Sequence, residues 1–255
     1  MNPLMEIKGC SFAYEDKENI IEDINFSVSS GDIFCILGAN GTGKTTLIKC
    51  LTGLMSPHSG EILIDGRDMN SFSRADLAKK IGYIPQIHNS TFPFTVLDVV
   101  LMGRSPHLDM FESPSEKDYK IALKSLKSLN IDYMKDKPYT EISGGEQQLV
   151  FIARVLTQEP SILILDEPTS HLDFGNQIRT LNIIKQPANN GLSVIMSSHF
   201  PDHAFISANN VALMNGKRFL AIGKPEDVIT TENMKKIYGI DVKVMDIGKR
   251  MACIP

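Results

Sequence analysis

Eight consecutive residues near the start of the chain have the types and spacing of a site for phosphate groups. They match the pattern GxxxxGK[ST] and read Gly38-Ala39-Asn40-Gly41-Thr42-Gly43-Lys44-Thr45. Glycines let the backbone curl so that several N–H groups point inward, and Lys44 adds a full positive charge near the terminal phosphates. The Thr45 hydroxyl is placed to bind Mg²⁺, and Thr46 is the next expected contact. These residues, which we call the phosphate loop, predict a nucleotide site.

Two carboxylates follow an apolar run much later in the chain. Ile162 to Leu165 reads as a buried strand, and Asp166 and Glu167 come directly after it. Ligands of open α/β sheets bind at the carboxyl ends of the strands, so we expect this pair beside the phosphate loop. Asp166 is expected to support Mg²⁺ through water, and Glu167 to polarise the attacking water. An acidic pair by itself is more often an ordinary turn, but the phosphate loop favours the catalytic interpretation.

The phosphate loop lies where a strand and a helix must meet. The run from Ile33 to Leu37 is apolar on both faces, which is typical of a buried parallel strand. A helix is expected from Lys44 or Thr45, ending near Gly53. Its apolar positions have helical spacing and are Leu47, Ile48, Leu51 and Leu54.

Antiparallel strands are expected on both sides of this unit. Apolar residues alternate from Ile24 to Val28, and Asp65-Gly66 predicts a tight turn within a sheet that extends to about Asp68. Asn215-Gly216, between two apolar runs, predicts a hairpin. A further parallel strand is expected from Ser193 to Met196.

Helical periodicity dominates the middle of the chain. Residues 95–157 are expected to be mostly helical, with one buried stripe formed by Ile121, Leu123, Leu126 and Leu129. Another helix is expected from about Gly175 to Lys185, with Pro187 marking its end.

Composition narrows the classes of function. The 255 residues are 42% hydrophobic, which is ample for a packed core, and the net charge of −4 gives no reason to expect a polyanionic partner. The apolar runs are far shorter than the ~20 residues of a spanning helix, and Met1 to Gly9 does not read as a signal peptide. Cytoplasmic residence is therefore expected. The four cysteines lack metal-site spacing and are expected to be small, reduced core residues.

The segment Ile142-Ser143-Gly144-Gly145-Glu146-Gln147-Gln148, the signature segment, closely resembles the ABC (ATP-binding-cassette) ATPase family. Read physically, Ser143, Gly144 and Gly145 open a helix whose N-terminus can face an anion. An ordinary helix cap, with Ser143 at the N-cap and Glu146 completing a capping box, is compatible with that role. In the family this surface serves the ATP that the other subunit holds.

Further residues match the family in the expected order, over roughly residues 4 to 225. The resemblance implies that Tyr14 stacks on adenine, that Gln86 senses Mg²⁺ and the γ-phosphate, and that His199 contacts the γ-phosphate. Ser170-His171-Leu172-Asp173 resembles the loop that links the two nucleotide sites, in which His171 is expected to be a surface or interface residue. Leu149 and Phe200 depart from the family pattern, where arginine and an acidic residue are common, which puts only details of interface packing in doubt.

The resemblance also implies the architecture. We expect an α/β fold, namely a P-loop NTPase core of the RecA-like type with an N-terminal antiparallel β subdomain and an inserted α-helical subdomain. One ABC ATPase domain would span residues 1–255. Its core would lie at about 1–87 and 158–225, its helical subdomain at about 88–157, and a C-terminal extension at about 226–255.

The implied function is ATP hydrolysis that drives a separate membrane protein. The resemblance implies ATP and Mg²⁺ as cofactors, a homodimer in the ATP-bound state, and a transmembrane permease subunit as partner. It also implies that the chain itself lies peripherally at the cytoplasmic face of the cell membrane. The stretch from Phe92 to His107 looks like the corresponding part of importers of iron-siderophore complexes, haem and cobalamin, although a helix of core residues explains its apolar positions equally well. An importer of that type would use a substrate-binding protein upstream.

Two other functions compete with transport. A soluble ABC ATPase that acts on DNA or ribosomes would use the same nucleotide chemistry. However, no long heptad repeat separates Lys44 from Asp166, and only one phosphate loop is present. A small-molecule kinase would leave the signature segment unexplained. The transported substrate and the direction of transport do not follow from this sequence, because membrane and capture subunits select the substrate.

Overall fold

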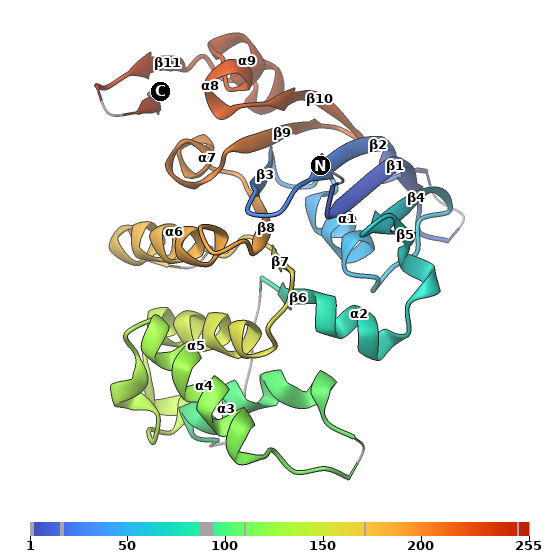
Figure 1. Cartoon of the computed structure of the whole chain (residues 1–255). Helices are drawn as coiled ribbons and strands as arrows, with labels where there is room; N and C mark the ends of the chain where they lie inside the picture. The colour runs from blue at the N-terminus through green and yellow to red at the C-terminus, as the bar shows by residue number, and fades with distance from the viewer. Residues whose placement is uncertain are drawn as a thin grey trace.

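A mostly parallel β-sheet forms the centre of the computed structural model (Figure 1). The structure describes residues 3–15, 18–86, 94–109, 111–170, 172–248 and 250–254. The strands of this sheet follow the order β10-β9-β3-β8-β7-β6, and β10 alone in that order runs antiparallel to its neighbour. Their bounds are β3 (Ile33–Gly38), β6 (Ile81–Ile84), β7 (Ile162–Leu165), β8 (Ser193–Ser198), β9 (Asn210–Asn215) and β10 (Arg218–Gly223).

A second sheet is antiparallel and has the order β2-β1-β4-β5. Its strands are β1 (Met5–Phe12), β2 (Ile21–Val28), β4 (Ser59–Ile64) and β5 (Arg67–Asp68). The expected turn at Asp65-Gly66 joins β4 to β5, and both residues have positive φ, at 51° and 75°. Asparagine, aspartate and glycine tolerate this backbone conformation, which is why the dipeptide predicted the turn correctly.

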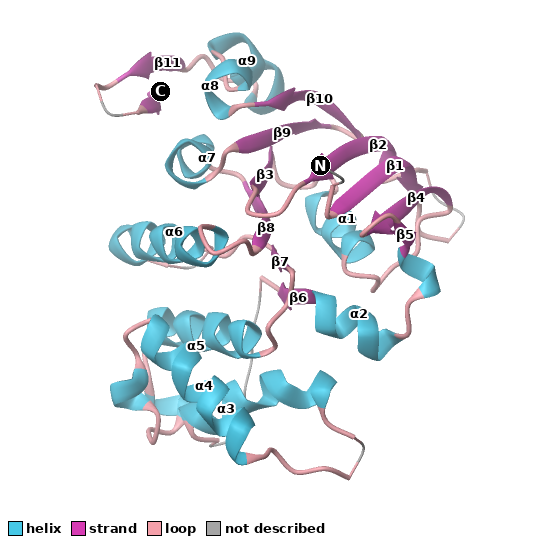
Figure 2. Cartoon of the chain, viewed as in Figure 1, coloured by secondary structure: helices cyan, strands magenta, loops and turns pink. Residues whose placement is uncertain are grey.

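Alternation along the central strands divides the core into two layers. In β3, Ile33, Cys35 and Leu37 face a cluster that includes the helices α3 to α7, whereas Phe34 and Ile36 face the antiparallel sheet and α1. Successive side chains of a strand point to opposite faces, so a run without polar residues is what a sheet covered on both sides requires. Figure 2 shows α6 and α7 on one side of this sheet, and α1 with the antiparallel strands on the other.

The helices fall into three groups along the chain. The first group, α1 (Lys44–Leu51) and α2 (Arg74–Lys80), lies near the antiparallel sheet (Figure 1). The second group covers the expected helical region and comprises α3 (Val96–Leu101), the 3₁₀ turn η2 (Met102–His107), α4 (Glu116–Ser128) and α5 (Gly144–Thr157). The third group comprises α6 (Phe174–Ala188), α7 (Pro201–Ser207), α8 (Pro225–Val228) and α9 (Thr231–Tyr238), before the hairpin β11 (Lys243–Asp246) and β12 (Met251–Ile254). Short 3₁₀ turns at Met69–Ser71, Asp132–Met134 and Tyr139–Glu141 complete the elements.

The expected fold class is confirmed by these elements and by the solved structures compared below. The central sheet, the antiparallel sheet at the N-terminal side and the helical insertion between β6 and β7 are all present. The division into subdomains at about residues 87, 157 and 225 stays a prediction. Within the described part of the chain, no helix combines the length and apolar character that crossing a bilayer requires.

Three local predictions were wrong in detail. The buried residues of α4 are Asp118, Ala122, Ser125 and Leu126, and its C-cap Leu129 is buried as well. Ile121 and Leu123 are half-exposed, because they lie on either side of the buried face. Leu54 lies beyond the end of α1 and is 63% exposed. Pro187 lies inside the last turn of α6, which ends at Ala188.

The cysteines fit their predicted role. All four are free thiols, and Cys10, Cys35 and Cys50 are buried, whereas Cys253 is half-buried. Burial raises the pKa of Cys35 and Cys50 to about 12, so both remain neutral thiols near pH 7. They are therefore packing residues.

Candidate nucleotide site

The phosphate loop connects β3 to the first residue of α1, as its sequence predicts. Gly43 is the N-cap residue of α1 and has a φ of 95°, which favours glycine. A Cβ atom at Gly38 would approach the Met214 carbonyl oxygen to 2.7 Å, so only glycine fits against β9 here. The loop therefore turns tightly enough to aim the N-terminus of α1 toward the carboxyl edge of the sheet.

Lys44 is almost fully buried within this loop. Its Nζ donates hydrogen bonds to the carbonyl oxygens of Gly38, at 2.9 Å, and Ala39, at 3.0 Å. It also lies 3.4 Å from Oε1 of Glu167. A buried cation needs such partners, and their positions hold the charge at the mouth of the loop.

Besides Lys44, two further side chains from distant parts of the sequence approach the Glu167 carboxylate. Gln86 Nε2 donates to its Oε2 at 3.2 Å, and His199 Nδ1 lies 3.3 Å from the same oxygen. The His199 contact lacks hydrogen-bond geometry, so it is a close approach and not a formed bond. Glu167 itself has a φ of 48°, an uncommon conformation for a glutamate that the surrounding contacts must hold in place.

Ser197 connects the two carboxylates, and the sequence did not single it out. Its Oγ donates to Asp166 Oδ1 at 2.7 Å and accepts the backbone N–H of Glu167 at 2.8 Å. The residue is fully buried on β8, the strand next to β7. The serine pair Ser197-Ser198, after three apolar residues of β8, was the one available signal, and it becomes informative only when β7 and β8 are known to be neighbours.

Asp166 carries the feature that fits a metal ion. Its side chain is 1% exposed, and Oδ2 is a buried oxygen without a hydrogen-bond partner in the described structure. Such an oxygen is costly unless a ligand or water satisfies it. The described residues contain no group of three or more His, Cys, Asp or Glu side chains with metal-ligand spacing. The unpartnered Asp166 oxygen fits a Mg²⁺ ion that takes its remaining ligands from phosphate and water, and Thr45 and Gln86 remain the predicted further ligands.

Tyr14 lies beside the start of α1, as its predicted role requires. Its hydroxyl is 3.5 Å from Oγ1 of Thr46, and its ring packs edge-on against Phe12 with centroids 5.1 Å apart. The ring remains 39% exposed, which leaves a face free for stacking.

The signature segment forms a helix N-terminus away from these groups. Ser143 is the N-cap of α5, and the expected capping box with Glu146 is present. The Ser143 backbone N–H and hydroxyl both donate to Glu146 Oε2, at 2.8 and 2.7 Å, and these bonds lower the pKa of Glu146. Among the described residues, no hydrogen bond or ion pair joins this segment to the phosphate loop.

The glycines of the signature segment leave one side of the helix open. A Cβ atom at Gly144 would meet nothing within 4 Å, whereas one at Gly145 would approach Asn176 Nδ2 to 2.9 Å. A cavity of about 780 Å³ lies between the start of α5 and the side of α6, and Ser143, Gly145, Asn176 and Arg179 contribute to its wall. The helix N-terminus and the Arg179 guanidinium make this surface suitable for an anion.

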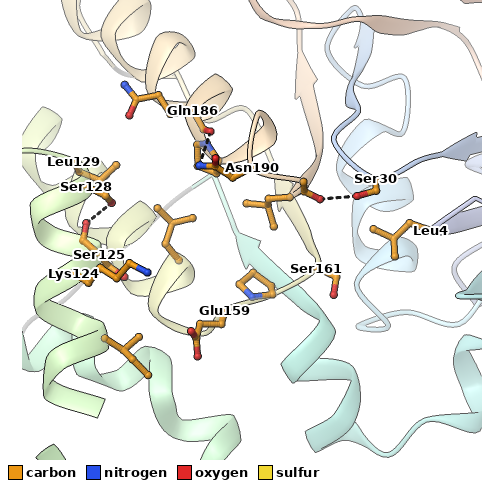
Figure 3. A pocket seen from close by; sticks show the side chains of 16 residues that line it. Leu4, Ser30, Lys124, Ser125, Ser128, Leu129, Glu159, Ser161, Gln186 and Asn190 are labelled. Carbon is orange, nitrogen blue, oxygen red and sulfur yellow. Dashed lines mark hydrogen bonds between the residues drawn. The ribbon is translucent and has the colours of Figure 1, made fainter. Parts of the chain in front are cut away.

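Another cavity, of about 660 Å³, lies at the amino edge of the sheet (Figure 3). Ser30, Ser161 and Leu192, which precede β3, β7 and β8, contribute to its lining. Its hydroxyls bond within its own wall, as Ser30 does to the Gly191 carbonyl at 2.9 Å and Ser128 does to the Ser125 carbonyl at 2.8 Å. This cavity contains none of the residues predicted to do chemistry.

The structure brings the predicted residues together in two groups. The first group lies at the carboxyl edge of the central sheet and comprises Tyr14, the phosphate loop, Gln86, Asp166, Glu167 and His199. The signature segment lies apart from it, in the helical region.

Three of the predicted residues fall outside the described part of the chain, namely His171, Phe92 and Pro93. In the rest of the importer-like stretch, Arg104 is buried and bonds to Asp118 at 2.8 Å and to Glu159 at 2.9 Å, so that part of it has a packing role.

Comparison with known proteins gives one family. A family profile described as "ABC transporter" matches residues 21–170. The molybdate import ATP-binding protein MolC of Haemophilus influenzae is 34% identical over 93% of this chain and 89% of its own. The probable iron chelatin transport ATP-binding protein of Helicobacter pylori is 37% identical over 92% of each chain. A solved structure described as an inward-facing, proposed metal-chelate type ABC transporter matches 99% of this chain and 96% of its own, with 31% identity and a TM-score of 0.87.

Proposed function

The chain belongs to the ABC transporter ATP-binding family, and from that premise we propose how its residues divide the work of ATP hydrolysis between two copies. As an ABC ATPase it binds ATP and couples hydrolysis to transport. We infer that two copies close head to tail around two ATP molecules, each held by the phosphate loop of one copy and the signature segment of the other.

The observation that carries this proposal is the convergence on Glu167. A carboxylate at the mouth of a phosphate loop, bonded by Lys44 and Gln86 and approached by His199, is placed to accept a proton from a water that attacks the terminal phosphate. Phosphoryl transfer asks for little covalent chemistry from the protein, so positioning and charge neutralisation supply most of the catalysis. Glu167 is therefore assigned as the general base.

The other groups hold the nucleotide and its metal ion. Lys44 and the N–H groups of the phosphate loop bind the phosphates, and Tyr14 offers its exposed ring to adenine. Thr45, Gln86 and Asp166 hold Mg²⁺, which neutralises phosphate charge when bound. His199 contacts the γ-phosphate from the end of β8.

The open face of the signature segment supports the second half of the proposal. Ser143 and Gly145 border a cavity, and Gly144 has no neighbour that a phosphate would displace. In the described part of the chain, no hydrogen bond or ion pair brings the phosphate loop of the same copy to that face, so in this proposal a second copy supplies its phosphate loop. Closure of two copies then follows from binding, and hydrolysis with product release opens them.

The transport partner and substrate are proposed from the relatives. We infer a permease subunit in the membrane, with this chain at its cytoplasmic face, and a metal chelate such as an iron-siderophore complex, haem or cobalamin as the imported substrate. A substrate-binding protein upstream completes an importer of that type. A relative named for iron chelatin and a structure described as metal-chelate type support this substrate class.

Reconstitution tests the transport proposal. The chain is purified with the membrane protein that accompanies it from native membranes, and the pair is placed in proteoliposomes with its capture protein. ATP-dependent uptake is measured for a ferric siderophore, haem, cobalamin and molybdate, with Glu167→Gln as the inactive control. Uptake of one of the chelates is expected; uptake of molybdate alone would overturn the chelate assignment, and recovery with ribosomes or DNA in place of a membrane protein would overturn transport.

A further inference from the structure

The C-terminal extension is packed onto the same core that carries the nucleotide site. Met234 and Ile237 of α9 and Val242 after it are buried in the cluster that also contains Cys35 and Leu37 of β3. Figure 1 shows α8 and α9 beside the edge strand β10 and its neighbour β9. The extension is therefore anchored by apolar burial close to the strand that leads into the phosphate loop.

Tyr238 reaches from this extension to the loop that carries His199. It is the last residue of α9, which ends where Gly239 adopts a φ of 69°. Its hydroxyl donates a hydrogen bond of 2.9 Å to the backbone carbonyl oxygen of His199, across 39 positions of sequence. No sequence signal near either residue indicates this contact.

The phenol is kept in its neutral, donating form. Burial raises the pKa of Tyr238 well above its usual range.

The accepting loop is short enough for this bond to affect the imidazole. His199 and Phe200 are the whole connection between β8, which ends at Ser198, and α7, which begins at Pro201. The Phe200 N–H donates to Ser198 Oγ at 3.0 Å, which fixes the other side of the loop. The His199 ring lies against the Phe200 ring, with centroids 4.0 Å apart, and its Nδ1 is 3.3 Å from Glu167.

A second contact joins the extension to the same region. Arg250, just before β12, forms an ion pair of 2.9 Å with Asp202 in the first turn of α7. Both side chains are about one-third exposed, so the pair contributes little to stability. It nevertheless provides an internal comparison, because it ties the extension to α7 without contacting His199.

We propose that Tyr238 is a positioning residue for His199, so that the C-terminal extension helps to set the geometry of ATP hydrolysis. This inference rests on the proposed role of His199 at the γ-phosphate. The hydroxyl fixes the His199 carbonyl, the short loop fixes the direction of the imidazole, and the imidazole is held at Glu167 for the reaction.

The test is a double-substitution cycle of Tyr238→Phe and His199→Ala. Tyr238→Phe keeps the ring and its packing and removes a single donor. One neutral hydrogen bond corresponds to about a fivefold change in rate, so kcat should fall about fivefold while KM for ATP changes by less than about twofold. In the His199→Ala background the same substitution should change single-turnover phosphate release by less than about twofold, because no imidazole remains to be positioned.

Control variants separate positioning from a general loss of structure. Tyr119→Phe makes the same chemical change on the exposed side of α4, and Arg250→Gln removes the other contact of the extension; both should leave kcat within about twofold of wild type. Thermal unfolding of each variant shows whether the fold is retained. Wild-type kcat in Tyr238→Phe, or an equal loss in both backgrounds, would overturn the positioning role, whereas wild-type turnover in His199→Ala would instead overturn the role of His199 in the proposed function.

Discussion

The phosphate loop and the signature segment both present a helix N-terminus suited to an anion, but the chain surrounds them very differently. At the phosphate loop, Lys44, Gln86 and His199 come from three separate segments, and each lies within 3.4 Å of the Glu167 carboxylate. At the signature segment, Ser143 bonds to Glu146 of its own helix. The difference supports the proposal that the phosphate-loop side carries the catalytic groups and that the signature segment completes the site of a second copy.

The largest loss of turnover is expected for a substitution of Glu167, because the proposal places the general base on the phosphate-loop side. Glu167→Gln keeps the shape of the side chain but removes the base, and turnover should fall by about 10² to 10⁴. ATP affinity should be retained, and ATP should hold two copies together because hydrolysis no longer separates them. Phosphate release and size-exclusion chromatography with ATP measure both effects. Turnover close to wild type would remove Glu167 from the base role.

Lys44→Ala should act on binding, because it removes the buried cation of the same surface. Loss of a charge-assisted contact with phosphate predicts a fall in ATP affinity of about tenfold to 100-fold. Lys49→Ala, which removes the same side chain from the same helix, is the matched control and should bind ATP normally. Equilibrium binding of labelled ATP measures the affinity of each variant. Equal affinity in both variants would count against the phosphate-loop assignment.

Ser197→Ala should test whether the positions of Asp166 and Glu167 matter for turnover, because it leaves both of their charges in place. It removes the acceptor of the Glu167 N–H and the donor to Asp166, so turnover should fall about tenfold with a loss of stability of about 1–3 kcal/mol. Ser193→Ala at the amino end of β8 also removes a buried hydrogen bond, to the Ser29 carbonyl, but should leave turnover unchanged. Equal loss of turnover in both variants would reduce Ser197 to a residue of general stability.

Ser143→Ala should have the smallest effect and should distinguish the signature segment from an ordinary cap. Both Ser143 and Ser115 form capping boxes, so each alanine variant should cost about 1 kcal/mol of stability. Turnover should fall about fivefold in Ser143→Ala alone, while ATP affinity of the single chain stays the same. If turnover is equal in the two variants, the Ser143 hydroxyl has a capping role only.

Sequence reasoning succeeded where the information is local. The phosphate loop, the strand before Asp166 and the Asp65-Gly66 turn each depend on neighbouring residues, and the structure has the loop, strand and turn at those positions. The wrong stripe on α4 also has a local cause, because apolar residues alone do not mark the buried face when Ala122 and Ser125 share it.

Long-range contacts account for what the sequence did not reveal. Ser197 is 31 positions from Asp166, and Tyr238 is 39 positions from His199, so neither contact leaves a pattern within a window of helix or strand length. Gln86 and His199 were found through the family resemblance, since an isolated glutamine or histidine carries no signal. Adjacency of β6, β7 and β8 in the sheet is the physical fact that turns such residues into a site.

Mixing two inactive variants tests most directly whether each site is shared between two copies. Lys44→Ala removes the positive charge of the phosphate loop. Gly144→Asp places a negative charge on the signature segment, at a position with space for a Cβ atom. In an equal mixture, half of the randomly formed pairs should contain one copy of each variant. Each such mixed pair has one intact site and one site with both defects, so a quarter of all sites are intact and phosphate release should recover to about a quarter of the wild-type rate. Release no greater than the mean of the two variants measured separately would contradict a shared site.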